Sequence, residues 1–415
     1  MAQPSTTTAP RPDSHSGGHV VLGYWDGEGI GPEITPPTRR AVELALEPSG
    51  VTVTWTRLEL GAAAFAATGQ VVPDATLATV LGSGEDAGLD GWVLGPHDNA
   101  SYPPEAREQL NPSAALRSAA DLWANVRPVL ALPGAPAPDL DVVVVRENTE
   151  GMYADRNMVT GSGDLRVTRD VALAVGVFTR EKIRRITGYA AKVAQGRGGV
   201  LTVAHKSNVL ARTSGMYLEE AERVSAATGV EIRPVHIDAL CAELVSHPGR
   251  HRTIVAENMF GDILSDLTAA LGGSLGTAGS VNAGDCHAMA QAAHGSAPDI
   301  AGLGTANPAG LMNSAAQLLS HLGYVREGGA LAASVRAALQ SRPTADVMAG
   351  GRPAGLPAGG SAAQVAGTGR TPVESDGAGP GGAGGNSGWT GVRPASTAEY
   401  SGEVFALLAG HSVRY

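Results

Sequence analysis

Short apolar runs alternate with longer amphipathic segments along most of this chain of 415 residues. Runs typical of buried or half-buried strands begin at His19, Val51, Gly91, Val142, Gly199, Val230 and Arg252. Apolar residues at helical spacing predict helices over 74–81, 172–195, 216–228, 238–246, 261–271, 309–322 and 395–408, and one that starts at or soon after Thr35. This alternation predicts an α/β fold with a largely parallel sheet, whose ligands gather at the carboxyl ends of strands.

Two aspartates lie four residues apart on the predicted helix 261–271. Asp262 and Asp266 therefore share one face, while the apolar residues occupy another. Like charges at this spacing repel unless something positive lies between them. A hard divalent cation such as Mg²⁺ or Mn²⁺ is one such partner, since it prefers carboxylate oxygens. A solvated acidic face is the alternative that spacing alone leaves open.

Three arginines, Arg117, Arg127 and Arg146, lie near the ends of predicted strands or helices. Guanidinium groups hold carboxylates through two parallel hydrogen bonds, so the set favours a substrate with two or more carboxylates. Each arginine taken singly is more typical of a surface ion pair. Lys206 follows a buried apolar strand, where an unpaired ammonium would cost several kcal/mol, so it is a candidate base.

Two glycine-bearing loops resemble the kind that nucleotide sites use, and they differ in what they predict. The first, 25–34, lacks the third glycine of a dinucleotide fingerprint because Pro32 stands there, so it does not predict a Rossmann site. The second, 294–300, precedes the predicted helix 309–322 and could present backbone N–H groups to phosphate.

The string NMFGDILSDLTAALGGSLG from Asn258 resembles the metal-binding segment of the β-decarboxylating dehydrogenases, the family of isocitrate, 3-isopropylmalate, homoisocitrate and tartrate/D-malate dehydrogenases. The resemblance extends to the segments GEGIGPE, ALRSAADLWANVRP, VRENTEG, HKSNVL and HGSAPDI, over roughly 20–322 and the C-terminus. The sequence departs from the family pattern at Glu28, where aspartate is usual, and at Gln291-Ala292, where Glu-Pro is usual. The resemblance implies an α/β, isocitrate/isopropylmalate dehydrogenase-like two-domain fold with a mixed, largely parallel sheet. Its domains would be 19–122 plus 273–415, which binds the cofactor, and 123–272, which binds substrate and dimerises.

The resemblance also implies a role for each matching residue. Asp238, Asp262 and Asp266 would hold Mg²⁺ or Mn²⁺, the three arginines would bind the malate moiety, Tyr153 would act as catalytic acid, and Lys206 would assist removal of the hydroxyl proton. The cofactor NAD would contact Asn208, His294, Gly295, Ser296, Ala297, Pro298, Asp299, Ile300 and Asn307. The carboxylate of Asp299 would accept hydrogen bonds from the ribose hydroxyls and repel a 2′-phosphate, which favours NAD.

The expected reaction is the NAD- and metal-dependent oxidative decarboxylation of a 3-substituted malate to a 2-oxo acid, CO₂ and NADH. Asn111 and Ser113 precede Arg117 and favour a polar third group on that malate, although Asn111 could instead only cap a helix. A 3-isopropylmalate dehydrogenase of leucine biosynthesis and a catalytically silent regulatory subunit are the alternatives. The family uses an arm, here 156–170, to form homodimers with shared active sites, so a homodimer is expected.

Composition limits the other possibilities. A net charge of -10 gives no reason to expect nucleic acid, whose binding usually requires basic patches, and no apolar run approaches the roughly 18 residues of a membrane span. The polar tail 1–18 has no signal-peptide pattern, so a cytoplasmic location is expected. The segment 350–394 reads as a disordered insertion rich in Gly and Pro. Cys241 and Cys286 are expected to be small buried hydrophobic residues.

Overall fold

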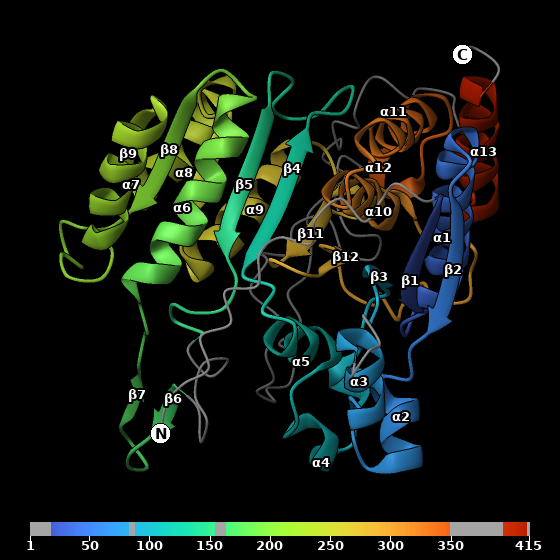
Figure 1. Ribbon diagram of the computed structural model, residues 1–415, viewed down its shortest axis with the longest axis horizontal. Coiled ribbons are helices and arrows are strands. Elements are labelled where there is room, and N and C mark those ends of the chain that lie inside the picture. Colours follow the sequence, from blue (N-terminus) through green and yellow to red (C-terminus); the bar gives the residue numbers. More distant parts are fainter. Residues whose placement is uncertain (1–17, 83–87, 154–162, 349–392, 413–415) are drawn as a thin grey trace, which may run out of the picture.

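The computed structural model describes residues 18–82, 88–153, 163–348 and 393–412. Their centre is a ten-stranded sheet of order β2-β1-β3-β12-β11-β4-β5-β10-β8-β9 (Figure 1). Its strands are β1 (His19–Trp25), β2 (Thr52–Arg57), β3 (Gly91–Leu94), β4 (Ala124–Leu130), β5 (Asp141–Glu147), β8 (Val200–His205), β9 (Glu231–His236), β10 (Thr253–Ala256), β11 (Gly279–Ala283) and β12 (Ala288–Ala292). The α/β fold predicted from the sequence is therefore confirmed, and the sheet is mixed and mostly parallel.

The sheet consists of two parallel halves joined by antiparallel strands. The first half is β2-β1-β3-β12 and the second is β5-β10-β8-β9. Between them, β11 pairs antiparallel with β12 and β4, and β4 pairs antiparallel with β5. The β11–β4 ladder contains only the pairs Val281↔Val126, Asn282↔Asn125 and Ala283↔Ala124. We call this short ladder the seam, because the two halves of the sheet meet there.

Helices cover both faces of the sheet (Figure 1). One face carries α1 (Gly31–Leu46), α6 (Arg180–Gln195), α7 (Gly215–Thr228), α10 (Ala309–His321), α11 (Val325–Ser341) and α13 (Thr397–Ser412), all of which contribute to one continuous apolar core. The other face carries α3 (Asp74–Leu81), α5 (Pro112–Ala119), α8 (Ile237–Ser246) and α9 (Asn258–Leu271), with separate cores under α3 and α5 and under α8 and α9. Shorter helices are α2 (Gly61–Thr68), α4 (Pro104–Arg107) and α12 (Ala345–Met348).

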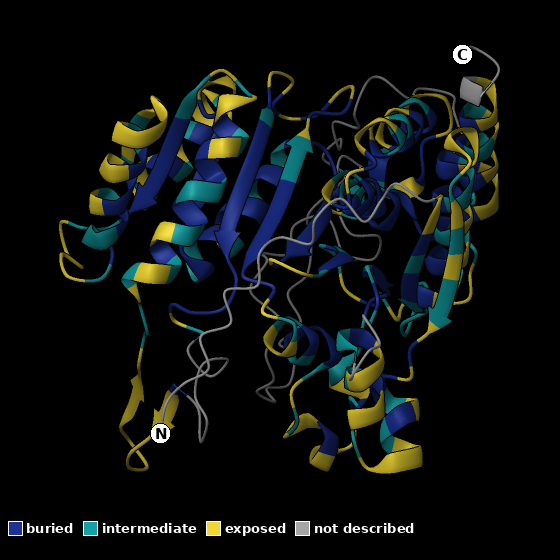
Figure 2. Ribbon diagram, viewed as in Figure 1, coloured by how far each residue is buried: buried dark blue, intermediate teal, exposed yellow. Residues whose placement is uncertain are grey.

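A two-stranded hairpin extends away from the body of the protein (Figure 1). It pairs β6 (Asp164–Arg166) with β7 (Ala172–Ala174), so the helix predicted over 172–195 is wrong in its first part and begins only at Arg180. Its apolar side chains are exposed (Figure 2): Leu165, Val167, Val171, Leu173 and Val175. The alternation of these residues is a strand pattern, but the alanines between them also suit a helix, which explains the error.

Most other elements lie where the sequence pattern put them, with shifted ends. α1 begins at Gly31 rather than near Thr35, and α13 begins at Thr397. The short strands β11 and β12 and the helix α11 carry weak patterns and were not predicted. The tail 1–18 and the insertion 350–394 fall almost entirely outside the described residues, as does the part 156–162 of the expected arm 156–170, whose remainder contains β6.

Two other expectations were tested. Cys241 is half-buried and Cys286 is exposed, so the expectation of two buried thiols is wrong. None of the helices in the described ranges combines the length and the apolar character that a membrane crossing requires.

Candidate active site

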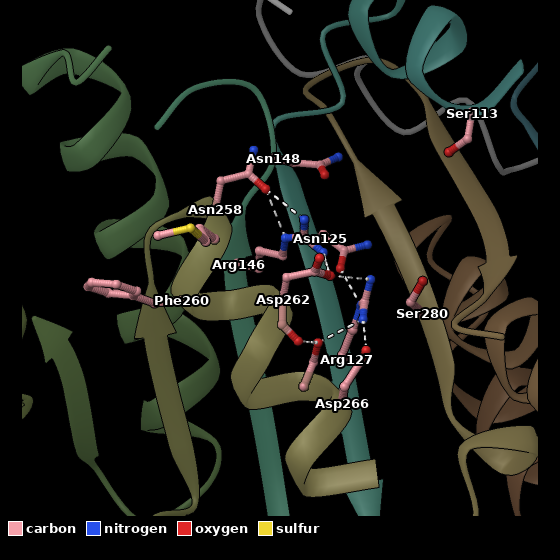
Figure 3. Close-up of polar contacts among 12 residues, drawn as sticks. Ser113, Asn125, Arg127, Arg146, Asn148, Asn258, Phe260, Asp262, Asp266 and Ser280 are labelled. Atoms are coloured by element: carbon pink, nitrogen blue, oxygen red, sulfur yellow. Dashed lines mark hydrogen bonds and ion pairs between the residues drawn. The ribbon is translucent and has the colours of Figure 1, made fainter. Parts of the chain in front are cut away.

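Two buried arginines and two solvent-facing aspartates form an ionic cluster between β4, β5 and α9 (Figure 3). The Arg127 Nη2 and Nη1 atoms lie 3.5 Å and 3.2 Å from Oδ1 of Asp262 and Asp266. Arg146 Nη1 donates to the same Oδ1 of Asp262. The arginine side chains are 10% and 3% exposed, whereas those of the aspartates are 37% and 60% exposed. The repulsion expected between the aspartates is thus offset by the arginines predicted to bind substrate.

Local sequence explains why α9 lies so close to Arg146. A Cβ atom at Gly261 would come within 2.6 Å of Arg146 Cγ, so glycine permits the contact between helix and strand. Glu257 caps the helix by accepting hydrogen bonds from the backbone N–H groups of Met259 and Phe260. Asn258 Oδ1 accepts from Arg146 Nε and Nη2 at 2.9 Å and 2.8 Å, which fixes the plane of the guanidinium.

Burial makes the cluster receptive to further anions. It lowers the pKa of Arg127, and the nearby positive charge of Arg146 lowers it further. Two neighbouring guanidinium groups in a desolvated position favour any carboxylate that can reach them. The arrangement therefore suits a substrate with several carboxylates, as the sequence suggested.

A chain of side-chain amides links this cluster to Arg117 across the seam. Arg127 Nε donates to Asn125 Oδ1, and both Asn125 and Asn148 donate to Asn282 Oδ1. Asn148 Oδ1 in turn accepts from Arg117 Nη1 at 3.3 Å. Sequence reasoning assigned no role to these three asparagines, because their partners lie far along the chain, although Asn125 and Asn148 both fall within the quoted motifs.

Ser113 and Gln291 form the other end of this network. Gln291 Oε1 accepts from Ser113 Oγ at 2.7 Å and from Arg117 Nη2 at 3.0 Å. Ser113 is buried, so its hydroxyl reaches a possible substrate only through this pair. Asn111 caps α5 by accepting from the N–H of Ala114, the role that sequence reasoning had kept as an alternative. Gln291, noted in the sequence as a departure beside the cofactor loop, thus contacts a predicted substrate arginine.

Tyr153 and Lys206 lie at two different strand ends. The guanidinium carbon of Arg146 is 6.0 Å from the centre of the Tyr153 ring, so this tyrosine lies beside the ionic cluster. Lys206 instead donates to Asp238 Oδ1 at 2.5 Å, and this contact is the main reason that the pKa of Asp238 is lowered. The Lys206 side chain is 27% exposed and paired with Asp238, so its ammonium is neither fully buried nor unpaired.

The metal ligands predicted from the resemblance do not all meet within one chain. No three His, Cys, Asp or Glu side chains in the described ranges are close enough together to hold a metal ion. Asp262 and Asp266 are neighbours, while Asp238 is paired with Lys206 beyond β8. The closest contacts of arginine with Asp262 and Asp266 are made through Oδ1 of each aspartate. Two partly exposed carboxylates one helical turn apart fit part of the ligand set of Mg²⁺ or Mn²⁺.

The two glycine-bearing loops pack against each other. Ile30 N–H donates to the Ser296 carbonyl at 2.9 Å, and a Cβ atom at Gly29 would lie 2.1 Å from the same oxygen. The carboxylate of Glu28 accepts from the backbone N–H groups of Ala62 and Asp98, so it fastens neighbouring loops. His294 Nε2 is buried and lacks a hydrogen-bond partner among the described residues. An unsatisfied ring nitrogen on a close-packed backbone surface fits a nucleotide-binding loop.

The remaining predicted cofactor residues differ in accessibility. Gly295, Pro298, Asp299 and Asn208 are exposed, whereas Ala297 and Ile300 are half-buried against the core. The buried side chain of Asn307 donates to Asp346 and accepts from Ala309 N–H, so it serves the local structure.

Comparison with known proteins gives a consistent result. The family model described as isocitrate/isopropylmalate dehydrogenase matches residues 22–356. An isocitrate/homoisocitrate dehydrogenase of Thermus thermophilus is 38% identical over 302 residues, which are 72% of this chain and 84% of the relative. A 3-isopropylmalate dehydrogenase of Rhodococcus jostii is also 38% identical, over 344 residues that cover 79% of this chain and 96% of the relative.

A solved structure of isocitrate dehydrogenase from Methylococcus capsulatus superposes with a TM-score of 0.73 and 28% identity, covering 94% of this chain and 99% of the other. The matched segment contains both glycine-bearing loops and the whole ionic cluster. The chain therefore belongs to the isocitrate/isopropylmalate dehydrogenase family.

Proposed function

We propose that this protein catalyses the NAD- and divalent-metal-dependent oxidative decarboxylation of a 3-substituted malate. The observation that carries the proposal is the ionic cluster, in which groups that bind carboxylates lie against groups that bind divalent cations. Family membership supports the reaction type, and the relatives named above act on hydroxy acids of this kind.

Each group in the cluster would have a separate task. Arg117, Arg127 and Arg146 would bind and orient the carboxylates. Asp262 and Asp266 would hold Mg²⁺ or Mn²⁺, which supplies a Lewis acid at the 2-hydroxyl and its carboxylate, while NAD supplies a hydride acceptor. Lys206 would take the hydroxyl proton, and Tyr153 would donate a proton to C3 after the bond to the departing carboxylate breaks.

We further propose that the active site is shared between two chains of a homodimer. Lys206 and Asp238 of the partner subunit would complete each site, since within one chain they lie apart from Asp262 and Asp266. Exposed apolar side chains support an extensive interface, namely Val209 and Leu210 beside Lys206, Val245 on α8, Ile263 on α9 and the five on the β6–β7 hairpin. The region 123–272 would then form the substrate and dimerisation domain, and the rest of the chain the cofactor domain.

The third group of the substrate is proposed to be polar or anionic. Ser113, Gln291 and Arg117 line this end of the amide network, and the Gln291 Nε2 atom makes no hydrogen bond to any described residue. An isopropyl group placed against Gln291 would leave its Nε2 donor desolvated and without a partner, which costs about 1–3 kcal/mol. Isocitrate, homoisocitrate, tartrate or a phosphonate analogue would fit better.

A substrate panel tests the reaction and the third group together. With Mn²⁺ and NAD, we expect kcat/KM for the best polar malate to exceed that for 3-isopropylmalate by at least about tenfold, measured by NADH absorbance. The opposite order would contradict the polar assignment and favour 3-isopropylmalate dehydrogenase, which the Rhodococcus relative also represents. If no NADH forms with any of these substrates, the proposed activity is contradicted, and a catalytically silent subunit remains as the alternative.

Cofactor preference gives an independent prediction. Replacing the exposed Asp299 with lysine, together with Ile300→Tyr, removes a carboxylate that would repel a 2′-phosphate. We expect the ratio of kcat/KM for NAD to that for NADP to fall by at least about tenfold. Asp139→Lys, at an exposed position in the β4–β5 loop, makes the same change of charge and should leave this ratio unaltered. A wild-type enzyme that already prefers NADP would contradict the role given to Asp299.

A further inference from the structure

A cavity of about 500 Å³ lies on the opposite face of the sheet from the ionic cluster. Successive residues of a strand point to opposite faces, so Asn125 and Arg127 of β4 face the cluster while Val126 and Pro128 line the cavity. Val281 of β11, paired with Val126 across the seam, lines the cavity as well. The cavity is therefore directly behind the seam.

Its walls come from both halves of the sheet. Tyr189 and Val193 of α6 form one wall, and α6 packs on the half that contains β5, β8 and β10. The opposite wall is formed by α10 and α11, which pack beside β11 and β12 (Figure 1). A molecule in this cavity would contact both halves of the protein at once.

Two successive glycines of α11 border the cavity. Gly328 allows α11 to approach α10, since a Cβ atom there would come within 2.4 Å of Ser320 Oγ. Gly329 also lines the cavity, but a Cβ atom at this position would meet no other atom within 4 Å. The volume falls within the roughly 300–1,000 Å³ of small-molecule sites.

The polar groups of this mostly apolar cavity indicate what it could bind. The guanidinium of Arg336 donates to the Ala131 carbonyl at 3.0 Å, and within the described part of the chain no carboxylate forms an ion pair with it. Gln317 Oε1 is buried and accepts no hydrogen bond from the described residues. The cavity thus offers a cation without an anion, and an acceptor without a donor, on an apolar surface.

We propose that this cavity is a second ligand site, which binds a small amphipathic anion. Such a ligand has an apolar, preferably aromatic, body for the surface formed by Tyr189, Val193 and Val126. It also carries one carboxylate or sulfonate for Arg336 and one N–H or O–H donor for Gln317 Oε1. The site requires neither substrate, nor metal, nor NAD. A test of this proposal is therefore independent of a test of the proposed reaction.

The dye 8-anilinonaphthalene-1-sulfonate is a suitable probe, because it combines aromatic rings, a sulfonate and one N–H group. We expect the intact protein, saturated with NAD, to bind one dye per chain in a fluorescence titration. Ala332→Trp, which fills the cavity from α11, should weaken binding at least about tenfold. Ala333→Trp is its matched control, since Ala333 is the exposed next residue of the same helix and does not line the cavity.

A second pair of variants tests the anion site without adding bulk. Arg336→Gln should weaken dye binding about tenfold. Arg342→Gln, which removes the same charge outside the cavity, should leave it within about twofold. The dye should also raise the melting temperature of the wild type but not of Arg336→Gln. The proposal would be overturned if the dye bound each cavity variant as tightly as its control variant, if NAD displaced the dye, or if binding did not saturate. If Ala332→Trp does not fold, the comparison of Arg336→Gln with Arg342→Gln decides.

Discussion

Replacing Asp262 with asparagine is expected to lower turnover by at least about 1,000-fold while the protein stays folded. Asparagine has the same shape as aspartate and keeps an oxygen that can accept from Arg146, but it removes a negative charge and a ligand from the proposed metal site. Mn²⁺ affinity, measured by titration calorimetry, should fall together with kcat. Unchanged values of both would refute the metal assignment.

Asp141→Asn is a matched control for Asp262→Asn. Asp141 lies at the start of β5, the strand that carries Arg146 near its other end. Asp141 is also paired with two arginines, Arg197 and Arg252, but it lies at the opposite end of the strand from Arg146. Asp141→Asn therefore makes the same chemical change to a similar ionic cluster outside the site. We expect it to leave Mn²⁺ affinity and kcat within about twofold, because partly exposed ion pairs contribute about 0–1 kcal/mol.

The ionic cluster also predicts how metal and substrate affect each other's binding. Without ligands, the two arginines and the two aspartates neutralise one another. A metal ion competes with the arginines for the aspartates, and a substrate carboxylate competes with the aspartates for the arginines. Each ligand thus frees the partner that the other needs, so their affinities should rise together and by the same factor. The Asp262→Asn variant should still bind substrate in the absence of metal. A variant whose site had unfolded would not bind substrate.

Local pattern was enough to predict the central part of the site. The strand before Glu257, the helix with Asp262 and Asp266 on one face, and the strand that ends at Arg146 are all encoded in short windows of sequence. What a short window cannot contain is a partner far along the chain. Gln291 contacts Ser113 and Arg117, more than 170 residues away. For this reason the sequence placed Gln291 with the cofactor loop, and the structure placed it beside an arginine.

The errors have a common physical origin in surfaces that one chain leaves uncovered. Leu173 and Val175 were assigned to a helix, yet they are exposed on and beside a hairpin strand. Lys206 was expected to be buried because an apolar strand precedes it, yet its side chain leaves the core and meets Asp238. Exposed apolar residues such as Val209 flank this pair. Leu173, Val175, Lys206 and Val209 are not buried within the single chain. A hydrophobic pattern in the sequence reports burial, so it cannot identify what these side chains contact.

Mixing two inactive variants should restore about a quarter of the wild-type activity, if each active site is shared between two chains. Lys206→Met and Asp262→Asn are each expected to be inactive alone. In a dimer of one of each, one site receives both substitutions and the other receives neither. Random pairing makes about half of the dimers mixed, and each mixed dimer has one intact site of two. NADH formation by the unfractionated, co-expressed chains provides the measurement, and the mixed dimer purified through its two tags should show about half of the wild-type activity.

The control for this experiment is a pair that should not complement. Tyr153 lies beside Arg146, so it belongs to the same side of the site as Asp262. When Tyr153→Phe and Asp262→Asn are mixed, every mixed dimer therefore has one substitution in each site, and no activity should return. Recovery by Lys206→Met with Asp262→Asn, but not by this control, requires Lys206 to act in the site of the other chain. Equal failure of both pairs, with mixed dimers shown to form, would mean that each chain builds its own site without Lys206 and Asp238 of its partner.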